Sequence, residues 1–181
     1  MRMHIPYIVG FIDNLISSFQ HFTGVDCVKK FIIHLFSYRK ESKIFINAFN
    51  GSKFDHYEFV KRLNKMYSER NDTDDGSFKL DKLVLNNGAI LKAAVGNIDC
   101  FDISKHITGT LRQNLKEMGC VVQKGDFDYS GGDEWDKMSD VDQASCLPYL
   151  EGDVLGLKEL TELLNQSCFE KFGVNLYKYM S

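Results

Sequence analysis

The chain has 181 residues and a formal net charge of −3, and this length predicts a single domain over residues 1–181. The slight acidic excess excludes a generally basic nucleic-acid-binding surface but leaves room for a local basic groove. Its five cysteines are scattered without a CxxC pair, which favours reduced thiols over a zinc site or a disulfide framework. The apolar runs are too short to span a bilayer, so we expect no membrane partner.

Hydrophobic patterning predicts alternating strands and helices in the first part of the chain. Strands are expected at 5–13 and 19–22, and a helix follows from 27 to about 38, where apolar residues repeat at helical spacing. The nearly continuous apolar run 44–49 predicts a strand that is covered on both faces. A second helix is expected from 55 to about 68. Its inner face is predicted to carry Phe59, Leu63 and Met66.

A β-hairpin is the clearest expectation for the middle of the chain. After a polar loop over 69–77, two apolar runs within 80–95 flank Asn87-Gly88, which suits a tight primed turn. A short strand is expected at 99–103. Thr108 is predicted to cap a helix that ends at Met118, with Gly119 as its stop.

The last part of the chain is predicted to be mainly helical. A loop rich in Gly and Asp covers 124–137, and a short helix is expected at 140–146. Pro148 suits the first turn of a separate last helix that runs to about Phe172 and ends at Gly173. Strands and helices interleave, so the predicted fold class is α/β, with a mixed sheet flanked by helices.

Two short stretches carry carboxylates in positions that suit chemistry. The strand at 44–49 breaks at Asn50-Gly51 and delivers Asp55 to the start of a helix, while Tyr149 and Asp153 lie four apart on one helix face. Two converging carboxylates can hold a hard divalent cation, and such ions drive phosphodiester hydrolysis. Each carboxylate also has a purely structural alternative: Asp55 could cap the helix that it begins, and Asp153 could form a salt bridge.

Three motifs, in this order, resemble those of the exonuclease domain of protein-primed family B DNA polymerases of phages, viruses and linear mitochondrial plasmids. Asn50-x-x-x-Phe54-Asp55 looks like the second exonuclease motif, and Tyr149-x-x-x-Asp153 looks like the third. Between them, the stretch from Lys124 to Tyr129, Lys-Gly-Asp-Phe-Asp-Tyr, resembles the lysine motif. The resemblance covers about 4–179 and implies a ribonuclease H-like 3′–5′ exonuclease fold.

The resemblance implies a metal site and a site for a strand end. Asp55 and Asp153 would bind Mg²⁺ or Mn²⁺, and Asn50 and Phe54 would hold the single-stranded 3′ end of DNA. Phe54 would offer a base a stacking surface. Its plain structural alternative is packing in the core.

The resemblance also implies three residues that act on the scissile phosphate. Tyr149 would help to orient the attacking water or the phosphate, and Lys124 and Tyr129 would support catalysis. A lysine aimed at that phosphate can offset the negative charge that builds up as the bond breaks. The plain alternatives are an interfacial tyrosine and a solvated surface lysine.

The sequence departs from the family pattern in two places. The opening Asp-x-Glu motif has no counterpart before residue 4, so the first strand of the sheet is expected to be missing and the metal to be held only weakly. The Ser of the family's single-strand motif is displaced, since Asp102-Ile-Ser104 stands there. We therefore expect little or no exonuclease activity from this chain alone, and an exposed sheet edge that promotes self-association.

The resemblance implies that the chain is a fragment of a DNA polymerase whose polymerase motifs it does not contain. The parent would act in DNA replication, with primer-template DNA, deoxynucleotides and a terminal protein as partners. It would be intracellular, and mitochondrial if a plasmid carries it. The alternatives are an inactive relic that binds DNA weakly and a domain that serves only in interactions.

Overall fold

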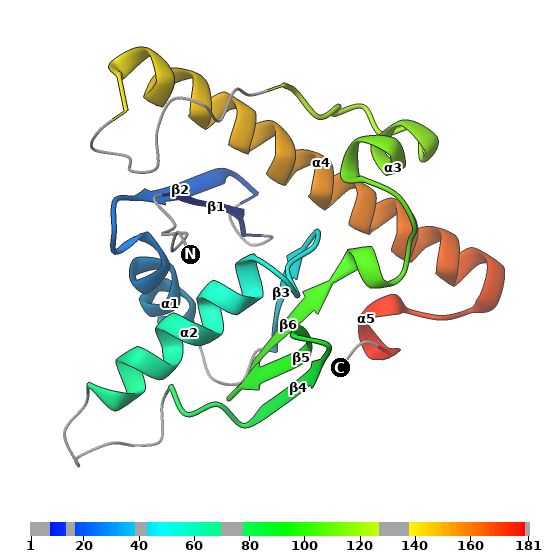
Figure 1. Cartoon of the computed structure of the whole chain (residues 1–181). Helices are drawn as coiled ribbons and strands as arrows, with labels where there is room; N and C mark the ends of the chain where they lie inside the picture. Colours follow the sequence, from blue (N-terminus) through cyan, green and yellow to red (C-terminus); the bar gives the residue numbers. More distant parts are fainter. Residues whose placement is uncertain (1–7, 14–16, 39–42, 70–77, 127–137, 180–181) are drawn as a thin grey trace. The chain divides into compact units, whose positions relative to one another are not determined.

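The computed structural model describes residues 8–13, 17–38, 43–69, 78–126 and 138–179, and it is a mixed α/β structure (Figure 1). The chain forms two compact units. The sheet unit is the continuous segment Val28–His106, and the helical unit combines Met1–Cys27 with Ile107–Ser181.

The sheet unit contains a four-stranded mixed sheet in the order β3-β6-β5-β4. β3 pairs in parallel with β6, and the other neighbours pair antiparallel, which confirms the predicted mixed sheet. The predicted hairpin is also confirmed, because Asn87 and Gly88 both have positive φ, 48° and 76°, as a primed turn requires. The strands are β3 Ile44–Ala48, β4 Lys82–Asn86, β5 Ala89–Val95 and β6 Ile98–Asp102.

Two helices pack with this sheet into one hydrophobic core. α1 spans Cys27–Phe36 and α2 spans Asp55–Ser68, as the helical spacing predicts. The predicted inner face of α2 is confirmed, since Phe59, Leu63 and Met66 are all buried. The core joins the two helices to β5 and β6, and its fully buried members include Ile32, Leu63, Ile90, Ala93 and Ile98.

The strand β3 differs from its prediction in burial. Ile44–Asn47 are only half buried and Ala48 alone is buried, so the expectation of cover on both faces is wrong. Among the described strands β3 is the first in the order of the sheet and pairs with β6 alone, whereas β6 lies between two strands and is buried along its whole length. The parallel pairing brings the carboxyl ends of β3 and β6 to the same edge of the sheet.

The helical unit is built along one long helix. β1 (Ile8–Ile12) and β2 (Phe19–Thr23) form an antiparallel hairpin, which confirms both predicted strands within the described residues. The long helix α4 (Asp140–Phe172) contacts both strands and two further helices, α3 (Leu111–Glu117) and α5 (Leu176–Tyr179). A Cβ atom at Gly10 would lie 2.6 Å from Cδ2 of Leu150, so the glycine allows the hairpin to approach α4 closely.

Two helix boundaries differ from their predictions. The expected separate helices at 140–146 and 148–172 are one continuous helix of 33 residues, with Pro148 inside it. Pro148 is exposed, and α4 continues through it because contacts with β1, β2, α3 and α5 outweigh the cost of one missing hydrogen bond. Thr110, not Thr108, caps α3, because the Thr110 hydroxyl accepts from the Gln113 N–H in a capping box. Gly119 and Gly173 follow α3 and α4 in the left-handed conformation, as predicted.

The cysteines, the helices and the loop at 69–77 can each be compared with their predictions. All five cysteines are free, and Cys168 alone of the five is not fully buried, which confirms the expected thiols. Within the described segments, we find no helix of the length and apolarity that crossing a membrane requires. The predicted loop at 69–77 lies almost wholly outside the described residues.

Two glycines on α4 provide a test of how α3 packs on it. Gly152→Ala is expected to raise the free energy of unfolding by about 0.5–1 kcal/mol, because a methyl group there meets no atom of the described residues and glycine is costly inside a helix. At Gly156 the new Cβ would lie 3.0 Å from Cδ1 of Leu115, which is fully buried. Gly156→Ala should therefore be less stable than Gly152→Ala by about 1 kcal/mol or more in urea denaturation. Equal stabilisation by both would contradict this packing.

Candidate functional site

A tight turn follows β3 and leads into α2. Asn50 adopts a left-handed conformation with φ of 62°, which asparagine tolerates better than most residues. Gly51 is required by space, since a Cβ there would lie 2.6 Å from Cβ of Ala48 and 2.7 Å from Cε1 of His56. The predicted break of the strand at Asn50-Gly51 is thus confirmed, and the left-handed φ belongs to Asn50 and not to Gly51.

The backbone of this turn is held on two sides. The carboxylate of Asp102, at the end of β6, accepts hydrogen bonds from the N–H groups of Asn50 and Ser52, both at 3.0 Å. The Ser52 carbonyl in turn accepts from the N–H of Ile90 on β5 at 2.8 Å. Gly51 and Ser52 are buried, whereas the side chain of Asn50 is exposed. The main chain of the turn is therefore fixed, while the side-chain amide of Asn50 is accessible to a ligand.

Phe54 and Asp55 lie where the turn becomes helix. Phe54 is 65% exposed, which rules out core packing as its role. Asp55 is the first residue of α2, and no side-chain cap is formed at Phe54, the residue before it. The Asp55 side chain is exposed, yet desolvation by the surrounding protein, aided by the negative Asp102, raises its pKa. Its exposed position limits the size of that effect.

His56 lies beneath the turn and was not singled out by the sequence. Its side chain is 2% exposed, and Nε2 has no hydrogen-bond partner among the described residues. Burial lowers the pKa of His56 to about 4, although Asp102 and a backbone hydrogen bond at Ile46 act in the opposite direction. His56 is therefore neutral at physiological pH and packs against Gly51.

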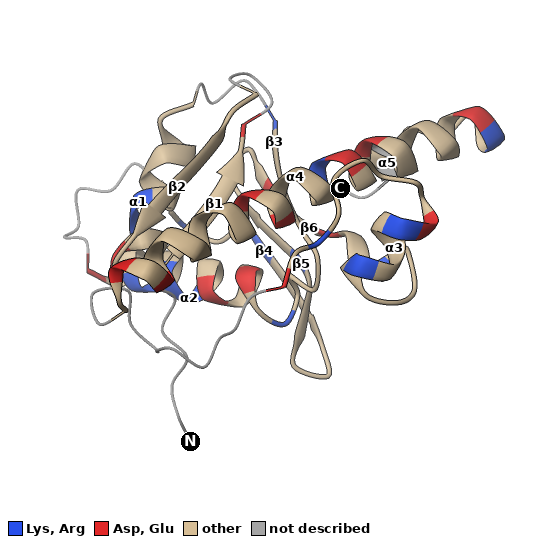
Figure 2. Cartoon of the chain, turned by 90° about the horizontal axis from the view of Figure 1, so that it is seen from above, with Lys and Arg blue, Asp and Glu red and all other residues tan. Residues whose placement is uncertain are grey.

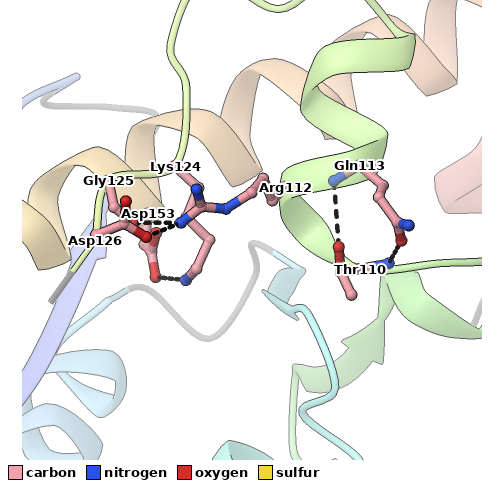
Figure 3. Close-up of polar contacts among 7 residues, drawn as sticks. All are labelled: Thr110, Arg112, Gln113, Lys124, Gly125, Asp126 and Asp153. Atoms are coloured by element: carbon pink, nitrogen blue, oxygen red, sulfur yellow. Dashed lines mark hydrogen bonds and ion pairs between the residues drawn. The ribbon is translucent and has the colours of Figure 1, made fainter. Parts of the chain in front are cut away.

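The helical unit brings together three residues from two of the predicted motifs. Lys124 forms an ion pair with Oδ2 of Asp153, and both side chains are partly buried (Figure 3). The Lys124 Nζ atom also lies 4.9 Å from the centroid of the Tyr149 ring, within the range of a cation–π contact. Tyr149 and Asp153 share one face of α4, as their spacing predicts.

The segment that carries Lys124 is anchored by a second carboxylate. Glu159, six residues after Asp153 on α4, accepts hydrogen bonds from the N–H groups of Val121 and Val122, at 2.8 and 3.0 Å. These two bonds lower the pKa of Glu159, so it is ionised at neutral pH. They fix the register of the segment against α4.

Arg112 on α3 adds a contact to the same segment. Its guanidinium donates to the carbonyl of Gly125 at 3.0 Å and to the Asp126 carboxylate (Figure 3). Asp126 is strongly exposed, so this ion pair contributes little to stability. Acidic residues outnumber basic ones along α4 (Figure 2), and Lys124 forms an ion pair with one of them, Asp153.

Asp153 has one feature that suits a divalent cation. Its Oδ1 atom is buried and has no hydrogen-bond partner in the described part of the chain, so it keeps lone pairs for a hard cation. Its other oxygen is taken by Lys124. Among the described residues there is no group of three or more His, Cys, Asp and Glu side chains placed to hold a metal ion.

The predicted site residues are thus divided between the two units. Asn50, Phe54 and Asp55 belong to the sheet unit, and Lys124, Tyr149 and Asp153 belong to the helical unit. The convergence of Asp55 with Asp153 stays a prediction, and Tyr129 lies outside the described residues. Sequence reasoning gave no role to Asp102 or to His56. The signal for Asp102 was a carboxylate at the end of a buried strand.

Comparison with known proteins gave no match. No protein-family model, no curated protein and no solved structure was found to match this chain.

Because His56 is buried in its neutral form, we expect the free energy of unfolding to decrease in mild acid. Between pH 6.5 and about 4 the unfolded chain protonates this histidine and the folded chain does not. Stability contributed by His56 is therefore complete above pH 6.5 and decreases by about 3 kcal/mol as the pH falls to about 4. His106, whose pKa burial also lowers, acts with the same sign, and Asp55, whose pKa is raised, acts with the opposite sign.

Urea denaturation at several pH values checks this, with His56→Asn as the comparison. The substituted chain should lose less stability than the original over this range, because asparagine does not titrate. The imidazole of His56 can also be followed by NMR in the original chain, where its midpoint should lie near pH 4. A midpoint near pH 6.5 would contradict the burial of a neutral ring.

Proposed function

We propose that this chain is most of the proofreading exonuclease domain of a protein-primed family B DNA polymerase, with a ribonuclease H-like fold. The observation that carries the proposal is the contact of Lys124 with Asp153 and Tyr149. Lys124 and Asp153 are 29 positions apart and come from two motifs that the resemblance connects with one scissile phosphate. Their meeting in one cluster supports a shared role.

The sheet unit supports the second half of the proposal, the holding of a DNA strand end. Asn50 and Phe54 both have exposed side chains, on a turn whose main chain is anchored. The turn lies at the carboxyl end of a parallel strand pair, the edge at which open α/β sheets bind ligands. Phe54 offers a face on which a terminal base can stack, and such stacking tolerates any base.

The residues of the helical unit suit phosphodiester hydrolysis. A divalent cation bound at Asp153 would supply Lewis-acid activation of the phosphate and of the attacking water. Lys124 supplies a positively charged ammonium group, which can exchange its contact with Asp153 for one with the phosphate as negative charge develops there. Tyr149 holds the Lys124 ammonium over its ring and so limits where that charge can lie.

An inactive relic of such a domain is the second candidate, and one observation favours it. Lys124 forms an ion pair with Oδ2 of Asp153, and this contact balances the charge of both side chains without a metal. A relic would bind single-stranded DNA weakly and without dependence on divalent cations. Mg²⁺ or Mn²⁺ dependence of binding therefore separates the two candidates. The proposed DNA, nucleotide and terminal-protein partners of the parent polymerase, and its mitochondrial location if plasmid-borne, follow from the first candidate alone.

Phe54→Ala tests the proposed strand-end site. A 5′-fluorescein oligodeoxythymidylate with a free 3′ end is titrated with the full chain, and its anisotropy is measured. Loss of one stacked base should weaken binding by roughly 1–3 kcal/mol. Phe169→Ala is the matched control, because Phe169 is 62% exposed on α4 but lies outside the motifs. Equal affinities for both variants would count against the proposed site.

The chain alone is expected to release nucleotides from this oligonucleotide very slowly, because the resemblance assigns only two of its carboxylates, Asp55 and Asp153, to the metal. Product release is measured by gel electrophoresis in Mg²⁺ and in Mn²⁺, with a chelator as the blank. Any slow activity should disappear in Asp153→Asn. Rapid Mg²⁺-dependent degradation that is lost in Asp55→Ala would overturn the expected weakness of the site.

A further inference from the structure

Asp102 makes an unusually complete set of contacts for a side chain without a predicted role. Its carboxylate is 7% exposed and accepts from the N–H groups of Asn50 and Ser52. It also accepts from the N–H of Ser104 at 3.0 Å and from the Ser104 hydroxyl at 2.7 Å. Both carboxylate oxygens are therefore occupied by donors from two separate segments.

These contacts require an ionised carboxylate. A carboxylate only accepts hydrogen bonds, and here each of its oxygens faces at least one N–H group. An asparagine in its place would turn an NH₂ group toward a backbone N–H. Burial alone would raise the pKa of Asp102, but the hydrogen bonds from Ser52 and Ser104 outweigh burial and hold it below its usual range.

The turn needs this support because it is strained. A non-glycine residue in the left-handed region costs on the order of 1 kcal/mol, and it persists where surrounding contacts fix it. Asn50 is such a residue, and its own N–H group is one of the two that Asp102 holds. The second held group, on Ser52, lies two residues before Phe54. The carboxylate therefore holds the main chain at Asn50 itself and two residues before Phe54.

We propose that Asp102 is a positioning residue that shapes the turn for a single-stranded DNA end and acts through Asn50 and Phe54. The inference rests on the proposed function only for the identity of the ligand, a single-stranded DNA end. The role of Asp102 in shaping the turn rests on the hydrogen bonds alone, so this role and the proposed function can fail separately. Ser104 binds the oxygen of Asp102 that also accepts from the Asn50 N–H, and the displaced serine of the Asp102-Ile-Ser104 stretch therefore acts on the turn instead of directly on DNA.

Asp102→Asn is the test, and Asp99→Asn is its matched control. Asp99 lies on the same strand, is 8% exposed, and pairs with Lys43 at 2.8 Å instead of with the turn. In NMR spectra of the full chain, the amide protons of Asn50 and Ser52 should shift upfield in Asp102→Asn and stay unchanged in Asp99→Asn. Unchanged amide shifts in Asp102→Asn would overturn the proposal. Thermal denaturation of both variants shows whether each still folds, and Ser104→Ala, which removes one bond to Asp102, serves if Asp102→Asn does not fold.

Binding of the 5′-fluorescein oligodeoxythymidylate supplies the functional readout. Asp102→Asn should weaken it roughly tenfold, and Asp99→Asn should not. The double variant Asp102→Asn/Asn50→Ala should bind no more weakly than the weaker single variant, because one residue acts through the other. Additive losses would mean that Asp102 does not act through Asn50.

The outcomes separate the two proposals. If Phe54→Ala leaves the affinity unchanged, the proposed function fails, and the amide shifts still decide whether Asp102 sets the turn. If Phe54→Ala weakens binding and Asp102→Asn does not, the proposed function stands and the positioning role is overturned.

Discussion

The candidate site depends on carboxylates that accept hydrogen bonds from the backbone of irregular segments. Asp102 on β6 holds the turn that carries Asn50, and Glu159 on α4 holds the segment that leads to Lys124. In each unit a regular element supplies the carboxylate, and a loop supplies two N–H groups that would otherwise need water or another partner. A charged acceptor makes such bonds about twice as strong as neutral ones. Residues proposed to bind DNA therefore lie on loops with a fixed main chain.

Ionisation separates these anchors from the histidine beneath the turn. Hydrogen bonds hold the pKa of Asp102 and of Glu159 below the usual range, so both anchors stay charged well into acid. His56 is uncharged for the opposite reason, since burial disfavours the imidazolium and no described residue forms a hydrogen bond with Nε2. Mild acid should therefore weaken the packing of α2 against the turn before it releases the carboxylate anchors. The turn is thus held by the charged Asp102 carboxylate, which binds its backbone, and by the uncharged His56 ring, which packs against Gly51.

Sequence patterns predicted what local physics determines. The helix at 55–68, the Asn87-Gly88 hairpin and the shared face of Tyr149 and Asp153 all follow from spacing and turn chemistry within a few residues. Pro148 was placed wrongly because its local cost is outweighed by the contacts of α4, which no short window contains. Asp102 had no visible role for a similar reason: its partners at Asn50 and Ser52 lie 52 and 50 residues earlier in the chain. Pairing of that kind is set by the parallel β3–β6 register.

The ion pair of Lys124 with Asp153 determines how strongly a metal ion could bind in the helical unit. A cation at Asp153 gains a carboxylate whose Oδ1 is buried and has no partner among the described residues, but it meets the ammonium of Lys124 at Oδ2. Like charges a few ångströms apart repel, so a cation binds well only if Lys124 shifts or if further carboxylates offset its charge. Tyr149 gives the ammonium a second contact and so opposes that shift. The same geometry therefore favours weak metal binding and places the lysine charge where a phosphate would compete for it.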